Sequence, residues 1–160
     1  DAQEIRKSEQ SKIAMSDRLA GQIGSELKVM SGHSMYWSGT LTSVGQGWIQ
    51  LSSNAENILI PQHALCWWEG KTSFSVTDER PLTRKLSLGY ALRALATARW
   101  PLRFFHMVGE TTTEGTIERV GLDFCEIALH PLEGNFRSKE ITGYRIVPVQ
   151  NISAVCSLNV

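Results

Sequence analysis

The stretch GTLTSVGQGWIQL at residues 39–51 decides the fold, because it returns as GTIERVGLDFCEI at residues 115–127. The two copies are identical at four positions and keep an apolar side chain at three more. A second match follows each copy, IPQHAL at residues 60–65 and VPVQNI at residues 147–152. Self-similarity of this kind identifies a repeat architecture before any strand is assigned. The chain is therefore a tandem duplication.

The length of 160 residues allows one ordinary domain or two small ones, and the duplication favours two. Units of roughly 65–75 residues lie near the lower size limit for a self-sufficient core, so they usually pack against each other or against further copies. The expected divisions are a charged tail or helix at residues 1–15, a first repeat at 16–70, a linker at 71–86 and a second repeat at 87–160.

Sixteen basic and sixteen acidic side chains cancel, so no net field attracts polyanions. This balance counts against non-specific coating of nucleic acid but leaves room for a small local site. The three cysteines, Cys66, Cys125 and Cys156, are odd in number and widely spaced, which argues against a disulfide framework and against a zinc ribbon. We therefore expect neither a bound metal nor a cofactor.

No apolar run approaches the ~20 residues that a helix needs to cross a bilayer. The sequence starts at Asp1 rather than at a methionine and has no signal-like segment there, so the native start is expected to be missing. We predict a cytoplasmic protein with no membrane association.

Each repeat is predicted to open with a short helix. In the first repeat, Ser16 and Asp17 offer an N-cap before a short apolar face. In the second, Ser87 can cap a helix whose apolar face is followed by Pro101, a residue type that ends helices. Five strands are expected after each helix.

The strands follow the same order in both repeats, and the second strand of each has a glycine near its middle, Gly39 or Gly115. A glycine inside a strand marks a sharp bend or a close backbone approach. Bends of this kind let a short sheet curl into a barrel. The clearest strands are expected at residues 36–44, 47–52, 57–61 and 65–68, with counterparts at 112–120, 123–129, 144–148 and 152–157.

A helix followed by five short strands, the second bent at a glycine, resembles the Sm-like barrel. Residues 39–51 and 115–127 resemble the first Sm motif, and residues 60–65 resemble the segment between strands four and five in the bacterial Hfq branch. The order is also similar to that of two-repeat proteins of actinobacteria. The resemblance implies a mainly β fold of two tandem Sm-like (SH3-like) five-stranded barrels, each preceded by a helix. It implies a non-catalytic nucleic-acid-binding protein, with RNA preferred, acting in post-transcriptional or transcriptional regulation.

The sequence departs from the Sm pattern at the residues that bind RNA. Sm-type proteins usually have an aspartate after the bent strand, where this chain has Gly45 and Gly121, and neither copy has the uridine-binding asparagine. The tyrosine–lysine pair of the Hfq pattern is replaced by Pro61 and Gln62, although His63 is retained. A second hypothesis therefore stays open: a protein-interaction or assembly module that keeps the barrel and has lost the RNA pocket. Another small barrel, such as an SH3-like one, is the alternative for the fold.

The resemblance implies an RNA site at the turn between the fourth and fifth strands. His63 would hydrogen-bond to a base or stack on it, with Gln62 beside it. Gln150 and Asn151 are weaker candidates at the same turn of the second repeat. The alternative for His63 is that its ring caps the tight turn.

The second helix and the segment before it form the basic region of the chain. Arg93 and Arg99 on this helix could contact the phosphates of a bound RNA. A solvated helix face is the alternative for both arginines.

Two adjacent aromatic pairs, Tyr36-Trp37 and Trp67-Trp68, lie in predicted strands. Neighbouring positions on a strand face opposite ways, so one ring of each pair is expected to point inward and the other outward. The outward rings would be stacking platforms or interface anchors, and an interface is favoured because Sm-like barrels associate through strands four and five. Three chains would then complete a ring of six barrels, whereas a chain that satisfies its edges internally would stay a monomer or dimer.

The sequence contains no recognisable arrangement of catalytic residues. His33, His106 and His130 have no acidic or nucleophilic partner at a recognisable spacing, and Asp123 and Glu126 would face opposite sides of a strand. We therefore predict that the protein is not an enzyme.

Overall fold

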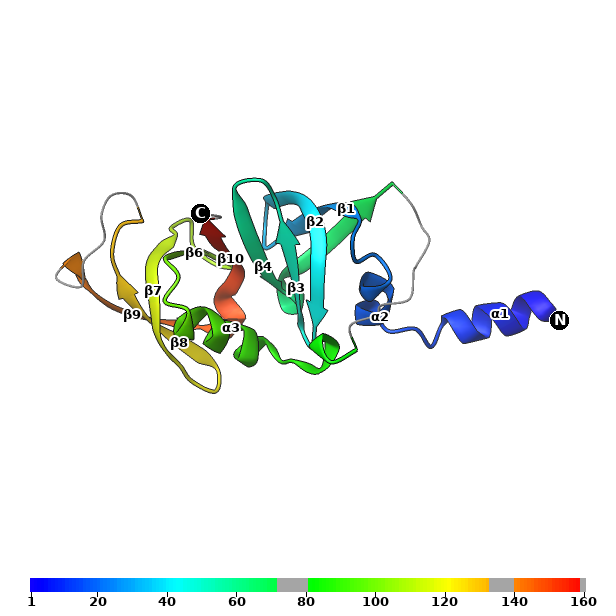
Figure 1. The fold of residues 1–160 in the computed structure, drawn as a ribbon. Helices are drawn as coiled ribbons and strands as arrows, with labels where there is room; N and C mark the ends of the chain where they lie inside the picture. The colour runs from blue at the N-terminus through cyan, green and yellow to red at the C-terminus, as the bar shows by residue number, and fades with distance from the viewer. Residues whose placement is uncertain (72–80, 133–139, 159–160) are drawn as a thin grey trace.

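The computed structural model describes residues 1–71, 81–132 and 140–158. It is mainly β with short helices, as the sequence predicts. The two repeats lie side by side, and the first helix projects away from all the strands (Figure 1). The predicted linker at 71–86 lies partly outside the described residues.

Three short α-helices and three 3-10 turns accompany ten strands in the described ranges. The helical elements are α1 (Ala2–Gln10), α2 (Met15–Ala20), η1 (Gln62–Ala64), η2 (Thr83–Lys85), α3 (Leu88–Thr97) and η4 (Val149–Asn151). The strands of the first repeat are β1 (Glu26–Ser31), β2 (Met35–Gly45), β3 (Trp48–Ser52), β4 (Glu56–Pro61) and β5 (Leu65–Gly70). The strands of the second repeat are β6 (Leu102–His106), β7 (Thr113–Val120), β8 (Phe124–Leu129), β9 (Gly143–Pro148) and β10 (Ile152–Leu158).

All ten strands belong to one open antiparallel sheet with the order β5-β1-β2-β3-β4-β10-β6-β7-β8-β9. The second half of this order repeats the first, because the fifth strand of each repeat lies beside its own first strand. This pairing does not show the two closed barrels that we expected. β4 pairs with β10 of the other repeat, so the two repeats share one sheet. Strands β5 and β9 are the free edges of that sheet.

The contact between β4 and β10 is the seam between the repeats. Trp48 and Leu59 of the first repeat pack into the apolar core of the second. Ala154 and Cys156 of the second repeat pack into the core of the first. Two units that are small on their own are thus stabilised by apolar burial across the seam. The register of the seam pairs Leu59 with Val155, Ile58 with Cys156, and Asn57 with Ser157.

The glycines in the second strand of each repeat lie against the backbone of the next strand. A Cβ at Gly39 would lie 2.6 Å from the carbonyl oxygen of Ser52. A Cβ at Gly115 would overlap the carbonyl oxygen of Ala128. The pairing register of both strands shifts just beyond these glycines. The predicted close approach is therefore confirmed in both repeats.

One of the two predicted helix caps is confirmed. The Ser87 hydroxyl accepts a backbone N–H in the first turn of α3. The predicted cap at residues 16–17 is wrong, because Ala14 is the N-cap of α2 and makes no side-chain hydrogen bond. The Asp17 carboxylate instead forms an ion pair with Arg84, and this hydrogen-bonded guanidinium lowers the pKa of Asp17.

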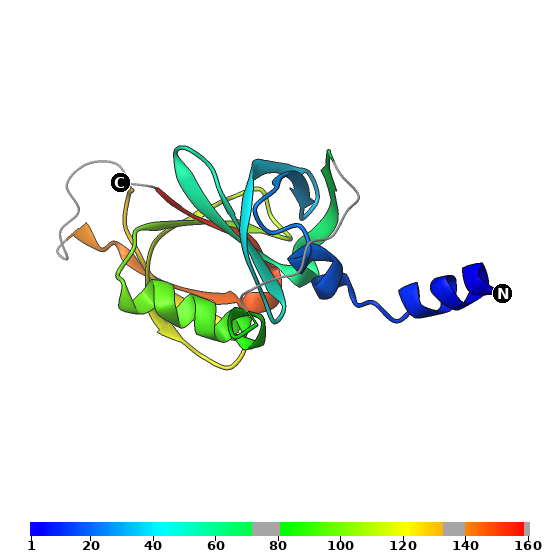
Figure 2. The same cartoon turned by 45° about the vertical axis from the view of Figure 1, so that its right-hand side comes forward.

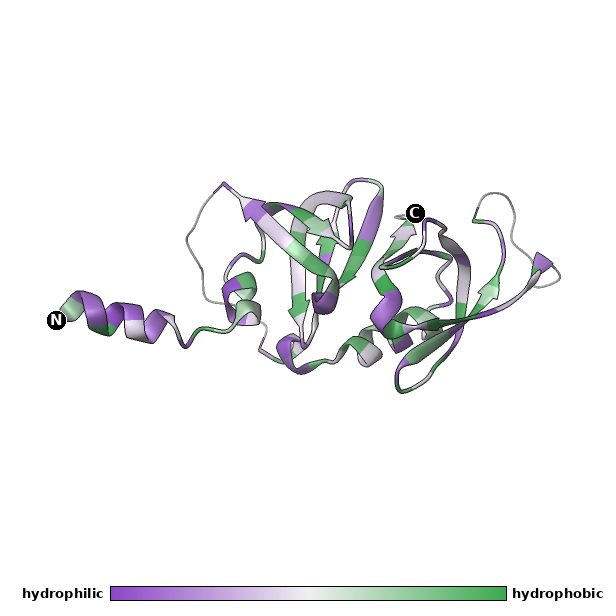
Figure 3. Cartoon of the chain, turned by 180° about the vertical axis from the view of Figure 1, so that it is seen from behind, coloured by the Kyte–Doolittle hydropathy of each residue, from purple (hydrophilic) through white to green (hydrophobic). Residues whose placement is uncertain are grey.

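The apolar residues gather on the strands and on α3, whereas α1 is mostly hydrophilic (Figure 3) and buries none of its residues. α3 runs beside the strands of the second repeat (Figure 2) and contributes Leu92 to its core. None of the helices in the described part of the chain is long and apolar enough to cross a membrane.

Candidate functional site

The turns between the fourth and fifth strands of the two repeats meet at the seam. η1 and η4 each follow a proline that ends the fourth strand. Together with the start of α3, the first residue of α2 and the turn between β2 and β3, they line a shallow depression of about 490 Å³. We call it the junction depression, and its lining residues are Met15, Gly47, Gln62, His63, Leu88 and Gln150. Three of the four residues predicted at these turns therefore come together in space.

His63 is hydrogen-bonded across the seam. Its Nε2 lies 2.9 Å from the carbonyl oxygen of Ile152, the first residue of β10. A carbonyl can only accept, so Nε2 carries the hydrogen and Nδ1 is the acceptor of the neutral ring. The residue is nevertheless exposed. His63 thus links the two repeats while one edge of its imidazole can serve a ligand.

Asn151 has a different place from the other three predicted residues. Its Oδ1 accepts the N–H of Val108 at 2.9 Å, and its backbone carbonyl accepts the N–H of Met107 at 2.8 Å. The corresponding residue of the first repeat, Ala64, makes the same kind of backbone bond with Gly32. Asn151 therefore holds the end of β6 in place and does not line the junction depression.

Arg93 and Arg99 also lie outside the lining of the junction depression. Arg93 is exposed on α3. Arg99 follows the helix, and its Nη1 lies 3.4 Å from Oε2 of Glu118 in an exposed ion pair. The structure does not bring these arginines together with the residues of the two turns.

The glycine at the end of the bent strand of each repeat has a packing role. A Cβ at Gly45 would overlap the indole of Trp48, and a Cβ at Gly121 would overlap the ring of Phe124. The Trp48 Nε1 donates to the carbonyl oxygen of Leu86 at 2.8 Å, which ties the first repeat to the segment before α3. The missing side chain at this position therefore makes room for an aromatic ring in both repeats.

The two aromatic pairs alternate as predicted. Trp37 is buried and lies edge-on to Phe105, with ring centroids 5.1 Å apart. Trp68 also packs against the first core. On the other face Tyr36 is exposed and its ring centroid is 5.9 Å from that of Trp67. One ring of each pair therefore remains on the outer face, close to the free edge at β5.

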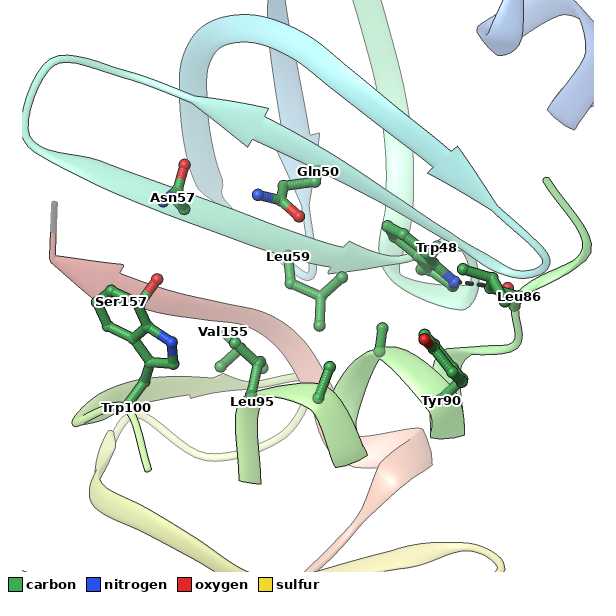
Figure 4. A pocket seen from close by; sticks show the side chains of 12 residues that line it. Trp48, Gln50, Asn57, Leu59, Leu86, Tyr90, Leu95, Trp100, Val155 and Ser157 are labelled. Atoms are coloured by element: carbon green, nitrogen blue, oxygen red, sulfur yellow. Dashed lines mark hydrogen bonds between the residues drawn. The ribbon is translucent and has the colours of Figure 1, made fainter. Parts of the chain in front are cut away.

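A second hollow, which the sequence did not predict, lies between the two repeats (Figure 4). This inter-repeat groove has a volume of about 340 Å³ and runs between β3 and β4 on one side and α3 on the other. Its lining includes Trp48, Gln50, Leu59, Tyr90, Leu95 and Trp100. The groove exists only because β4 pairs with β10, and no local pattern encodes that pairing.

Two cysteines and one histidine are buried in the described part of the chain. Burial raises the pKa of Cys125 to about 11 and also raises the pKa of Cys156, so both thiols are poor nucleophiles. The ring nitrogens of buried His130 lie 2.6 Å from the Thr116 hydroxyl and 2.9 Å from the Pro131 carbonyl oxygen. Within residues 1–71, 81–132 and 140–158, no three His, Cys, Asp or Glu side chains are grouped as metal ligands would be.

Comparison with known proteins assigns nothing further to this site. No family model matches the chain, and no curated protein matches it significantly. Its function therefore has to be argued from the two hollows and the two free sheet edges.

Proposed function

We propose that this chain is a non-catalytic tandem Sm-like protein of the cytoplasm that associates through its free edge strands and binds RNA at the seam between repeats. The observation that carries the RNA part is the junction depression, where Gln62, His63 and Gln150 meet from both repeats. The strand order, the bent second strands and the tight turns before the fifth strands support the Sm-like identity. The three free cysteines are consistent with a reducing compartment.

The chemistry of the junction depression suits the bases of a single strand. Two amides and an imidazole offer both donors and acceptors, which is what base edges require. Met15 and Leu88 add apolar surface against which a base can lie. No acidic side chain is among the lining residues, so a nearby phosphate meets no fixed negative charge there.

Binding of short uridine-rich and adenine-rich RNAs, measured at ~50 and ~200 mM salt, tests this part of the proposal. Because the lining has no lysine or arginine, we expect binding that changes little between the two salts, and a steep loss would indicate phosphate contacts elsewhere on the chain. Gln62→Ala and Gln150→Ala should each weaken it several-fold, because each removes an amide from the depression without touching the core. Gln3→Ala on the projecting helix α1 is the matched control and should change nothing.

The RNA part fails if neither RNA binds below about 10 μM at low salt. It also fails if both amide variants bind as well as the unaltered chain. The zero net charge and the lost Sm residues would then favour the other hypothesis, an assembly module without an RNA pocket.

The assembly part rests on an equivalence between the seam and the free edges. The seam joins the fourth strand of one repeat to the fifth strand of the other. The same two positions in the opposite repeats are β9 and β5, the strands that have no partner on their outer side. An unpaired edge favours pairing with another chain, and a head-to-tail contact of this kind can close into a ring.

The residues on the two free edges fit the register of the seam. Transferring the seam register onto β5 and β9 places Trp68 opposite Ile146, which matches the apolar pair inside the chain. It also places Glu69 opposite Arg145, both of which are exposed. The third pair sets Gly70 against Tyr144, a small residue against a large one.

The Glu69–Arg145 pair replaces an apolar pair of the internal seam. The residues at the same positions inside the chain are Cys156 and Ile58, both buried. The free edges thus have two opposite charges at the positions where the seam has two apolar residues. Complementary charges of this kind favour one partner and disfavour like-with-like pairing. Three chains joined in this way would form a ring of six repeats.

A further inference from the structure

The inter-repeat groove combines a buried apolar floor with aromatic side chains that are partly exposed. Its floor is apolar, with Leu59 and Val155 both buried. Two large aromatic side chains at its rim remain open to solvent, since Tyr90 is 49% and Trp100 is 38% exposed. A concave apolar hollow with a few polar groups and a volume of roughly 300–1,000 Å³ is typical of small-molecule sites. At about 340 Å³ the groove falls at the lower end of that range.

Trp100 is placed at the groove by the way in which α3 ends. Arg99 adopts φ 58°, the left-handed conformation, and is the one non-glycine residue with positive φ in the described part of the chain. Its N–H bonds to the carbonyl of Ala96, and the N–H of Trp100 lies 3.4 Å from the carbonyl oxygen of Leu95. This is a Schellman ending, in which the residue after the left-handed one packs back onto the last turn. Trp100 and Leu95 accordingly line the groove together.

The polar groups of the groove are neutral. The Gln50 side chain extends from β3 over the floor, and the indole of Trp100 lies at the end of the groove near Ser157 (Figure 4). The lining holds no carboxylate, ammonium, guanidinium or imidazole group. A charged ligand would therefore lose its hydration without a compensating partner, which favours a neutral one.

We infer that the inter-repeat groove binds a flat nucleobase of the adenine type. Aromatic rings provide stacking surfaces for bases, which suits Trp100 at the Ser157 end of the groove, whereas Tyr90 lies at the opposite end near Trp48 (Figure 4). A glutamine amide can donate to one ring nitrogen of adenine and accept from its amino group, which suits Gln50. The base can come from a free nucleoside or from a single strand. The groove shares no lining residue with the junction depression, so this inference stands whether or not RNA binds there.

Titration of the full chain with adenosine, followed by calorimetry and by the indole N–H resonances, tests the inference. Adenosine should bind saturably and move the Trp100 resonance. Trp100→Ala should weaken the binding at least about ten-fold, because it removes a stacking partner. Gln50→Ala should lower the affinity for adenosine roughly ten-fold, which would bring it close to the affinity for uridine. Trp67→Ala, on the outer face by Tyr36, is the matched control and should bind adenosine as the unaltered chain does.

The inference is overturned if adenosine does not bind saturably. It is also overturned if Trp100→Ala and Gln50→Ala both leave the affinity unchanged. Trp100→Phe keeps an aromatic ring at the site and should retain most of the adenosine binding. This variant distinguishes the loss of a stacking surface from misfolding. A short oligoadenylate that displaces adenosine would identify a strand as the source of the base, and one that does not would identify the free nucleoside. Gln62→Ala should leave adenosine binding intact, which separates this site from the junction depression.

Discussion

The Nε2 of His63 in the first repeat lies 2.9 Å from the carbonyl oxygen of Ile152 in the second. This bond joins the tight turn of one repeat to the start of the fifth strand of the other. The residue that most resembles the RNA-contacting position of the Hfq branch is therefore also a structural link across the seam. Its loss should affect folding as well as any ligand.

His63→Ala should lower the free energy of unfolding by about 1 kcal/mol, because the carbonyl of Ile152 loses its donor. Urea denaturation measures this loss. Gln62→Ala, at the neighbouring position of the same turn, is the control and should stay within about 0.5 kcal/mol of the unaltered chain. Equal stabilities for the two variants would contradict the structural role of the imidazole.

The local parts of the fold could be predicted from the sequence. The repeated stretches predicted the strands and their order. The bends in the second strands were predicted from Gly39 and Gly115, where a side chain would collide with the backbone of the next strand. The cap at Ser87 is also local, since the hydroxyl and the N–H that it accepts lie within one helical turn.

The long-range parts could not be predicted from the sequence. Asp17 lies within the first turn of α2 rather than at its cap, and its ion-pair partner Arg84 is distant in the sequence. The seam pairs Ile58 with Cys156, and nothing near either residue indicates that partner. Three residues of the junction depression were candidates because the family resemblance pointed to the turns, but their meeting across the seam was not predicted. The inter-repeat groove was missed because it arises only from the packing of one repeat on the other.

Gly39→Ala should lower the free energy of unfolding by roughly 1–3 kcal/mol, because the new methyl group would press on the Ser52 carbonyl. Gly143→Ala is the matched control in an edge strand. A Cβ there would meet only the Leu129 side chain at an ordinary contact of 4.0 Å, so the change should be near zero. Thermal or urea unfolding distinguishes the two, and a harmless Gly39→Ala would argue against the close backbone approach.

Arg99→Gly should raise the free energy of unfolding by about 0.5–1 kcal/mol, because glycine adopts the left-handed conformation without the cost of a side chain. The exposed ion pair with Glu118 that is lost contributes little. Arg93→Gly, within α3, should instead destabilise by about 1 kcal/mol. Opposite signs for the two substitutions in urea denaturation are the expected result, and a destabilising Arg99→Gly would contradict the strained helix end.

Stability should fall as the pH drops below about 6.5, in part because of His106. Burial lowers the pKa of this histidine in the folded chain, and nearby Arg145 lowers it further. The unfolded chain therefore takes up the proton at a higher pH than the folded one, so acidification favours unfolding until the pH passes below the folded pKa. His106→Gln should flatten the pH dependence of the melting temperature in this range. His33→Gln, at an exposed position, is the control, and an equal flattening there would contradict the assignment.

The proposed assembly requires that the seam inside the chain is repeated between chains, through Glu69 and Arg145. Light scattering across a concentration series measures the mass directly. We expect a mass above that of one chain, approaching three chains, for the unaltered protein. Glu69→Arg alone should reduce it to one chain, and Glu69→Arg combined with Arg145→Glu should restore the larger mass. A single-chain mass for the unaltered protein at ~100 μM, where even a weak contact would be populated, or a mass that Glu69→Arg leaves unchanged, would contradict the proposed assembly.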